Sequence, residues 1–516
     1  MTEPSATGAL LEKTAGGAGW TIGWRAATRA LGFLSTLVLA RVLVPADFGL
    51  VALAMSFARA VDILANMGVE DALVRATEPN RAMYDAAFTM NALRGLATAI
   101  IIGGSALPFA AFFGDPRLAN VVFALGAAVL LDAFDNVGIA DFRRHFAFRS
   151  EFQLYILPRV AQVIVTIILA LIWANYWALV AGILTARVLR VISSYVMHPY
   201  RPRFSLRAWH DIFSFSMWTW LISMATMIRG RGVIMIIGRL LNPTLLGVYT
   251  VGAEVATLPE SELIDPLCRV CFASFSAARR ASIGVAETYL RIISSTWIIA
   301  LPASIGISSI AAPLVFLGFG SRWSQAIPVV QIMALAGVFG VIGRISTTLF
   351  NAFAYLRSML VIILVMTTVQ LTSLTVLVWQ WGIPGAAIAM ATTALLEQLT
   401  CSALAFYTFH IPPSHLLRRI WRCVAAAASM AAVLTFTGLG WTLAEVTSAS
   451  SAKHLLVTCA LGALVYTTVL IGLWLACGRP KGPETDVLEL IRRMTSRLVL
   501  SLGRRAACVW NAGTRQ

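Results

Sequence analysis

Long apolar stretches separated by short polar segments recur along nearly the whole chain. A helix needs about 20 predominantly apolar residues to cross a bilayer. The segments that meet this requirement are residues 18–42, 47–67, 86–113, 119–140, 154–173, 176–198, 211–237, 244–266, 287–311, 327–349, 358–379, 383–407, 422–443 and 454–477. The pattern therefore predicts an all-α, polytopic membrane protein with about 14 transmembrane helices.

The composition favours one membrane-embedded unit over a series of soluble domains. Hydrophobic residues make up 59% of the 516 residues and charged residues only 12%, and the mean hydropathy is +0.80. Soluble proteins carry about 25% charged residues. The apolar segments also follow one another too closely to leave room for a soluble domain between them.

The net charge of +16 comes largely from arginines between the apolar segments. If the N-terminus is cytoplasmic, the outer loops carry only Arg41, Arg117, Arg239, Arg322 and Lys453, and the inner loops and C-terminal tail carry most of the rest. Basic loops remain on the cytoplasmic side of a membrane. The asymmetry predicts that both termini are cytoplasmic, and it accounts for the basic charge without nucleic acid. We expect the membrane to be a bacterial inner membrane.

Segments outside the spans carry little sign of chemistry. Residues 485–502 space their apolar residues as an amphipathic helix would, so we expect a basic tail (residues 478–516) lying on the inner leaflet. No cleavable signal peptide is visible, and the first span should be a retained anchor. Cys268 and Cys271 form a C-x-x-C without a second pair, so we expect neither a metal site nor a redox site there.

The chain contains an internal repeat at a constant offset of about 198 residues. Residues 40–49 read ARVLVPADFG and residues 238–247 read GRLLNPTLLG, which matches Arg41 with Arg239, Pro45 with Pro243 and Gly49 with Gly247. Six helices separate the copies, so the repeat is parallel, and transporters of this design hold substrate between their halves. We expect six-helix lobes over residues 1–205 and 206–410, followed by two more helices over residues 411–477.

These residues resemble a known family. The stretch over residues 19–54 resembles the start of Wzx-type polysaccharide flippases, and Arg41, Pro45, Phe48 and Gly49 match that family's R-x-L-x-P-x-x-F-G turn. The segments 72–75 (ALVR) and 143–149 (RRHFAFR) are also similar to it. The arrangement of six, six and two helices is similar to the lipid-flippase branch of the multidrug/oligosaccharidyl-lipid/polysaccharide exporter superfamily.

The resemblance implies a function. Such proteins move undecaprenyl-diphosphate-linked oligosaccharides from the inner to the outer leaflet by alternating access, for O-antigen, capsule or exopolysaccharide synthesis. It implies no cofactor and no ATP hydrolysis, and the chain has no G-x-x-x-x-G-K-[ST] loop. The implied partners are the lipid-linked oligosaccharide, membrane lipids and the polysaccharide polymerase and export machinery, and no nucleic acid.

Five arginines within the spans are the candidate substrate-binding residues: Arg25, Arg29, Arg59, Arg229 and Arg231. A charge near the bilayer centre costs at least about 2.5 kcal/mol on insertion scales. These arginines could form a cationic cavity for a diphosphate, since a planar guanidinium binds phosphate oxygens in pairs. The alternatives are that Arg25, Arg229 and Arg231 snorkel to a surface and that Asp62 neutralises Arg59.

Other charged residues also fall within the spans. Asp62, Asp132, Asp135, Glu254 and Glu397 could couple transport to an ion or act as counter-ions for arginines, and the second role is favoured. Arg94, Arg159, Arg187, Arg190, Arg291 and Arg344 are explained mostly by snorkelling, or in part by a vestibule for an anion.

Three other functions compete with the flippase. A drug/cation antiporter of the same superfamily would favour acidic residues in the first lobe, whereas the first helix carries two arginines and no acid. A membrane polymerase or ligase would need a large outer loop, and none exceeds about fifteen residues. A degenerate member acting as a scaffold stays open.

Overall fold

The computed structural model describes residues 23, 27–65, 69–76, 79–145, 147–209, 217–260, 265–281, 284–353, 355–441, 448–480 and 482–485. Nearly all of them are helical, and residues 27–42 form the first helix. The other long helices are α2 (Pro45–Ala65), α4 (Arg81–Phe113), α5 (Arg117–Asp132), α7 (Phe148–Trp173), α8 (Trp177–Met197), α10 (Met217–Leu240), α11 (Pro243–Ala256), α12 (Asp265–Ala281), α13 (Val285–Ser309), α15 (Ala326–Ala352), α16 (Leu356–Thr408), α17 (Pro413–Phe436) and α18 (Ser448–Ala476). Short helices are α3 (Val69–Arg75), η1 (Val137–Ile139), α6 (Ala140–Arg144), α14 (Ala311–Gly318) and η3 (Ser321–Trp323).

Proline and glycine set the joints between helices. Pro45 and Pro243 open α2 and α11, where a residue without a backbone N–H costs no helical hydrogen bond. The Asn242 side chain caps α11 by accepting a hydrogen bond from the Leu245 amide, with a distance of 2.8 Å. Gly382, at φ 62° and ψ −135°, breaks α16 into two helical segments, as expected from the predicted joint at Pro384.

Ten helices among the described residues are long and apolar enough to cross a membrane. An eleventh span results if α5 and the helical segment Val137–Arg144, which meet at a bend of 66°, count together. The break at Gly382 places two of the predicted spans within α16, and α11 has only 14 residues. The polytopic helical fold is confirmed, whereas the count of fourteen stays a prediction.

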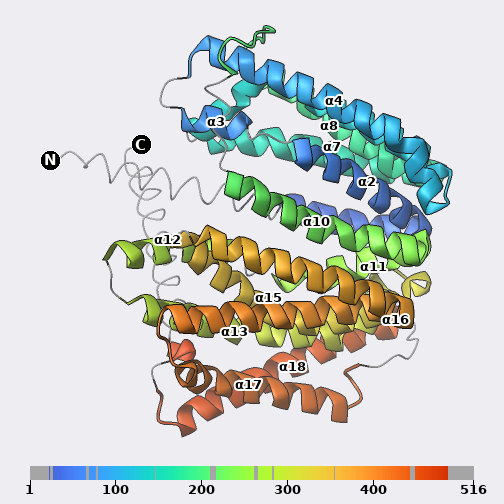
Figure 1. The fold of residues 1–516 in the computed structure, drawn as a ribbon. Helices are drawn as coiled ribbons and strands as arrows, with labels where there is room; N and C mark the ends of the chain where they lie inside the picture. The colour runs from blue at the N-terminus through green and yellow to red at the C-terminus, as the bar shows by residue number, and fades with distance from the viewer. Residues whose placement is uncertain are drawn as a thin grey trace, which may run out of the picture.

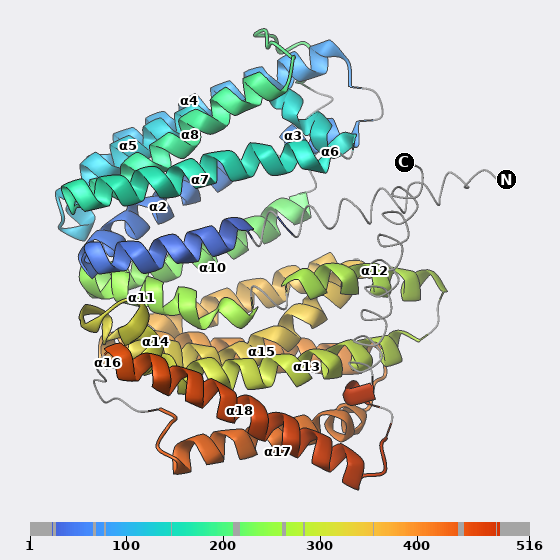
Figure 2. The ribbon, with the colours of Figure 1, turned by 180° about the vertical axis from the view of Figure 1, so that it is seen from behind.

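The helices lie in three groups that follow the order of the chain. Figure 1 shows α2 to α8 at one side, α10 to α16 in the middle and α17 with α18 at the other side. The reverse view in Figure 2 shows the same order, with α10 and α11 beside α2. The long helices run in roughly the same direction or its reverse, as spans of one bilayer must.

The two copies of the repeated turn pack directly against each other. A Cβ atom added to Gly49 would lie 1.7 Å from the carbonyl oxygen of Pro243. A Cβ atom added to Gly247 would lie 1.9 Å from the carbonyl oxygen of Pro45. This reciprocal contact is what a parallel repeat with an axis along the helices produces, because each copy meets the same surface of the other. We call this region the Pro45 end of the bundle.

Both repeat arginines reach across at the Pro45 end. Arg41 Nε donates to the carbonyl of Gly318 at 3.1 Å, and Arg41 Nη2 donates to that of Leu317. Arg239 lies over the Phe112 ring, with 5.2 Å from guanidinium carbon to ring centroid. Each arginine therefore joins its own helix to the half of the chain that does not contain it.

Trp323 strengthens the same region. Its side chain is fully buried, and its Nε1 donates to the carbonyl of Ala40 at 3.0 Å. Its ring meets Phe48 edge-on with 5.3 Å between centroids. In the orientation predicted from the loop charges, these contacts shut the outer end of the bundle.

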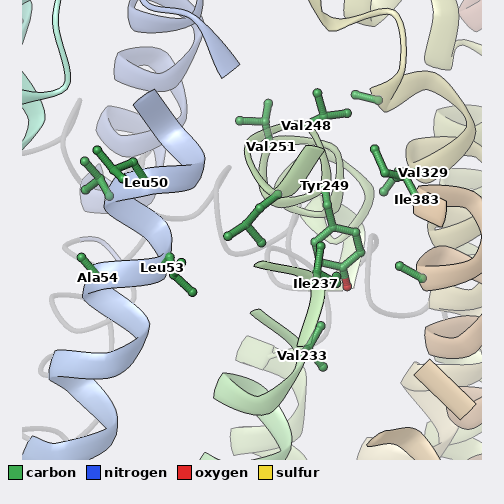
Figure 3. Packing of buried hydrophobic residues seen from close by; sticks show 14 of the residues in the cluster. Leu50, Leu53, Ala54, Val233, Ile237, Val248, Tyr249, Val251, Val329 and Ile383 are labelled. Atoms are coloured by element: carbon green, nitrogen blue, oxygen red, sulfur yellow. The ribbon is translucent and has the colours of Figure 1, made fainter. Parts of the chain in front are cut away.

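A continuous apolar core joins the two halves. Figure 3 shows Leu50, Leu53 and Ala54 of α2 facing residues of α10 and α11, with Val329 and Ile383 behind them. Burial of such side chains stabilises a membrane protein through close packing rather than through loss of water contact. The core therefore holds the repeat copies together around the Pro45 end.

Some segments differ from their predicted form. The loop expected after residue 266 contains α12, and its buried face carries Cys268 and Cys271, which are free thiols inside the helix. Within the described ranges no group of three His, Cys, Asp or Glu residues could hold a metal ion. The predicted amphipathic helix over residues 485–502 lies outside the described residues, apart from Thr485.

Candidate functional site

A cavity of about 480 Å³ lies among the first helix, α2, α7, α8 and α11. We call it the arginine cavity, because its charged lining residues are Arg59, Arg159, Arg187, Arg190 and Glu254. Most of the remaining lining is apolar, with hydroxyls from Ser35, Thr36, Tyr155, Thr166 and Thr250 and the amide of Gln162. Four guanidinium groups against one carboxylate give the described lining an excess of positive charge.

The charged residues lie near half depth in the bundle. At about 1.5 Å per residue, Arg159 is about 16 Å from the start of α7 and Arg187 about 15 Å from the start of α8. Glu254 is about 16 Å along α11. A bilayer's hydrocarbon core is about 30 Å thick, so snorkelling to a surface does not explain these positions.

Two of the four arginines are held by acids of α5 and its following turn. Arg187 Nη1 lies 2.7 Å from Asp132 Oδ2, and Arg190 Nε lies 2.8 Å from Asp135 Oδ2. The Arg190 guanidinium also lies 5.3 Å from the centre of the Tyr155 ring. These contacts fix both guanidinium groups in place, with part of each facing the cavity.

The other two arginines have no acidic partner at ion-pair distance among the described residues. Arg59 is exposed to the cavity and forms no hydrogen bond or ion pair there. Arg159 Nη1 donates to Gln162 Oε1 at 2.9 Å. Gly32 makes room for it, because a Cβ atom at that position would lie 2.5 Å from Arg159 Nη2. Their charge is available to a ligand.

A second cavity of about 420 Å³ lies among α10, α15, α16 and the segment after α11. We call it the paired cavity, since its charges occur as two ion pairs. Arg229 Nη1 donates to Glu397 Oε1 at 3.0 Å, Arg229 Nη2 donates to the other carboxylate oxygen, and Arg229 Nε donates to Gln370 Oε1 at 2.7 Å. Arg344 pairs with Glu260. This cavity is polar but neutral.

The alternative in which Asp62 neutralises Arg59 is not the pairing in the structure. Asp62 Oδ1 instead accepts a hydrogen bond from Arg94 Nη1 at 2.8 Å, across the interface of α2 with α4. The spacing of three residues places Asp62 and Arg59 on neighbouring helix faces, but α4 offers a guanidinium that points directly at the carboxylate. Asp132, Asp135 and Glu397 are likewise the partners of arginines on other helices.

The five candidate arginines do not all share one cavity. Arg25 lies outside the described residues. Arg29 precedes the lining residues of its helix and lies within electrostatic range of Glu254. Arg231 lies within range of Arg59 across the interface of α10 with α2. Arg229, by contrast, lies in the paired cavity and is neutralised there.

Sequence reasoning undervalued three residues that the fold brings together. Arg159, Arg187 and Arg190 belong to α7 and α8, and snorkelling was the favoured explanation for them. Their central position within each span was the signal that could have singled them out. Their convergence with Arg59 could not be read from the sequence, because it depends on how α7 and α8 pack beside α2.

Comparison with known families supplies the assignment. The family model described as "Polysaccharide biosynthesis protein" matches residues 38–328, which is more than half of the chain. The chain belongs to this family. The matched region contains every helix that lines the arginine cavity, although it begins within the first helix.

Similar proteins come from distant bacteria. The succinoglycan biosynthesis transport protein ExoT of Rhizobium meliloti is 24% identical over 62% of this chain and 65% of its own length. The lipopolysaccharide biosynthesis protein WzxC of Escherichia coli is 22% identical over 65% of this chain and 69% of its own. The teichuronic acid biosynthesis protein TuaB of Bacillus subtilis is 21% identical over 54% of this chain and 59% of its own length.

Two solved structures share the fold. The lipid II flippase MurJ in an inward closed conformation superposes with a TM-score of 0.74 at 12% identity, over 89% of this chain and 99% of MurJ. An inward-facing multidrug resistance transporter of the MATE family, a member of the MOP superfamily, superposes with a TM-score of 0.58 at 16% identity. The superposition covers 72% of this chain and 92% of that transporter. The protein is thus a multi-pass membrane protein with this transporter fold.

Proposed function

We propose that the protein translocates an undecaprenyl-diphosphate-linked oligosaccharide from the inner to the outer leaflet of a bacterial inner membrane by alternating access. The observation that carries the proposal is the arginine cavity, where Arg59 and Arg159 present charge at half depth with no acidic partner at ion-pair distance among the described residues. Keeping such charges in a membrane is costly unless they serve a ligand or a cavity with water.

A diphosphate fits this arrangement chemically. Its negative charges need partners when it leaves the water of the membrane surface, and guanidinium groups bind phosphate oxygens bidentately. We assign Arg59 and Arg159 as the principal ligands, with Arg187 and Arg190 as oriented secondary ones. Arg25, Arg29 and Arg231 remain candidates for guiding the headgroup, whereas we assign Arg229 a structural role in the paired cavity.

The contacts at the Pro45 end fit the conformation of an alternating-access cycle in which that end of the bundle is closed. Gly49, Gly247 and Trp323 close that end, so substrate would enter the arginine cavity from the opposite end, where the basic loops lie. Opening would require the α2–α11 contact to separate. The roles of the relatives in the biosynthesis of succinoglycan, lipopolysaccharide and teichuronic acid support a lipid-linked glycan as cargo.

The test is leaflet-resolved accumulation of diphosphate-linked oligosaccharide in the host. We would compare the intact protein, a deletion, Arg59→Ala, Arg159→Ala and Arg29→Ala, with Arg117→Ala as control. Arg117 is half exposed and pairs with Asp115 in the turn before α5, away from the cavity. Losing one charge-assisted contact of about 1.5–3 kcal/mol should reduce transport about tenfold or more.

The expected result is a glycolipid trapped in the inner leaflet in the deletion and in the two principal cavity variants, with Arg117→Ala behaving as wild type. An unchanged glycolipid distribution in the deletion strain would overturn the proposal. The drug/cation antiporter would then be the function to test, by loss of export of cationic compounds. If Arg59→Ala and Arg159→Ala transport the glycolipid as wild type does, the arginine cavity is not the binding site, although the proposed substrate still stands.

A further inference from the structure

Among the residues that the structure describes, Glu254 is the one acidic residue that lines the arginine cavity. It comes from α11, whereas the four lining arginines come from α2, α7 and α8 in the first half of the chain. Its side chain is exposed to the cavity, and within the described residues its carboxylate accepts no hydrogen bond and forms no ion pair. All the other acids near the cavity are engaged by arginines on neighbouring helices.

The groups that face Glu254 are almost all cationic. They are Arg29 on the first helix, Arg59 on α2, Tyr155 and Arg159 on α7, and Arg187 and Arg190 on α8. Arg231 on α10 lies within electrostatic range of Arg59 and does not line the cavity. The charged groups of α15 and of the segment after α11, Arg344 and Glu260, face the paired cavity instead. Burial in the protein disfavours an ionised carboxylate at Glu254, and the positive charges of Arg159 and Arg29 oppose that effect while the cavity holds no other anion.

A bound diphosphate would change that balance. Two unit charges about 6 Å apart repel by about 3 kcal/mol at an effective dielectric constant of about 20. A repulsion of that size corresponds to about two pKa units. The diphosphate would also take over the arginines that stabilise the carboxylate. Binding next to an ionised Glu254 is therefore opposed, and binding next to a neutral Glu254 is not.

We propose that Glu254 is an internal competitor of the substrate: its carboxylate compensates the cavity arginines in the empty protein and takes up one proton from water when the diphosphate binds. The inference rests on the proposed function and adds to it a proton that binds together with the diphosphate.

The sign of the pH effect follows from linkage. The protonated protein binds the anion more tightly, so affinity is highest at low pH and falls as pH rises above the pKa of Glu254 in the empty cavity. The affinity falls by up to about tenfold per pH unit over the pH range in which the complex keeps its extra proton. Glu254→Gln carries a permanently neutral side chain of the same shape, and it should bind tightly at every pH.

The experiment measures binding of farnesyl-diphospho-N-acetylglucosamine to the purified full-length protein in detergent by calorimetry, between about pH 5.5 and 8. This probe is a diphosphate diester, so its own charge stays constant in that range. Buffers with different ionisation enthalpies report the number of protons taken up by the wild-type protein directly. Glu287→Gln is the control, since Glu287 pairs with Arg419 outside the cavity.

Proton uptake on binding, a decline of affinity with pH in wild type and Glu287→Gln, and tight pH-independent binding to Glu254→Gln would support the inference. A wild-type protein that binds the probe without proton uptake would overturn it and leave the proposed function intact. Weaker binding to Glu254→Gln would also overturn it, because Glu254 would then assist the substrate. Absence of binding to the wild type at any pH would overturn both.

Discussion

Gly49 and Gly247 face each other between the two halves of the chain at the Pro45 end, and each leaves no room for a Cβ atom against the backbone of the other's turn. They occupy equivalent places in the two copies of the internal repeat. The contact lies at the start of α2 and α11, the two helices that carry Arg59 and Glu254 deeper in the bundle. A change at this contact should therefore alter how the two halves meet at the arginine cavity.

Gly49→Ala should destabilise the conformation in which the Pro45 end is closed. Its methyl group would overlap the Pro243 carbonyl, so α2 and α11 must separate, at a cost of about 1–3 kcal/mol. Thermal unfolding in detergent should show a lower midpoint. The matched control is Gly104→Ala in α4, where an added Cβ meets nothing within 4 Å. Equal midpoints for the two variants would contradict the tight contact.

Glu397→Gln should destabilise the protein more than the double variant Arg229→Gln with Glu397→Gln. The single change leaves the Arg229 guanidinium without its bidentate partner in a mostly buried cavity, which costs about 3 kcal/mol or more. The double change removes both charges together. Unfolding midpoints of the wild type, Arg229→Gln, Glu397→Gln and the double variant give the coupling energy. Additive losses would show that the ion pair contributes nothing specific.

Arg422→Ala should be strongly destabilising, because Arg422 and Glu484 are only 5% and 6% exposed and form two hydrogen bonds of 2.7 and 2.9 Å. Breaking a buried pair costs about 3–5 kcal/mol. Arg419→Ala is the comparison, since its partner Glu287 is 64% exposed, and such pairs contribute at most about 1 kcal/mol. Similar melting curves for the two variants would show that Glu484 does not fix the chain after α18 onto α17.

His198, just beyond the end of α8, should make stability depend on pH. Burial lowers the pKa of His198 below its usual value, although Asp141, 3.4 Å from Nε2, opposes the shift. Its Nδ1 accepts a hydrogen bond from the Tyr200 amide at 3.3 Å, which requires an unprotonated nitrogen. The folded state therefore binds a proton less readily than the unfolded state, and stability falls as pH drops below about 6.5.

The measurement is the unfolding midpoint at pH 7.5 and at about pH 5.5 for wild type and His198→Gln. The glutamine variant should lose less stability on acidification than wild type. His415→Gln is the control, because His415 is exposed on α17, on the other side of the bundle from α8. An unchanged acid sensitivity in His198→Gln would assign the effect to other groups.

Local patterns were sufficient to predict the class of fold. Apolar runs long enough to cross a bilayer predicted the helices, since a backbone in lipid must satisfy its own hydrogen bonds. Pro45, Pro243 and Pro384 marked joints that the structure contains, and the match of Gly49 with Gly247 revealed the repeat. The turn R-x-L-x-P-x-x-F-G pointed to the family that the comparisons establish.

The partners of the charged residues were beyond the reach of the sequence. Closeness in the chain offered Arg59 as one possible partner of Asp62, but Asp62 pairs with Arg94 on another helix. Arg229 was grouped with Arg59 because both lie within spans, but it lies in a different cavity with Glu397. An ion pair between helices depends on their rotation and depth, and neither is encoded in a local spacing.

The sequence by itself determined that this protein is helical, embedded in a membrane, internally repeated and rich in intramembrane arginine, because each property depends on residue type and spacing along one segment. Only the tertiary structure decided which arginines converge, which acids neutralise them and that Glu254 faces Arg159 across the two halves. Those relations arise from packing between segments up to about two hundred residues apart, where the orientation of each helix selects its neighbours.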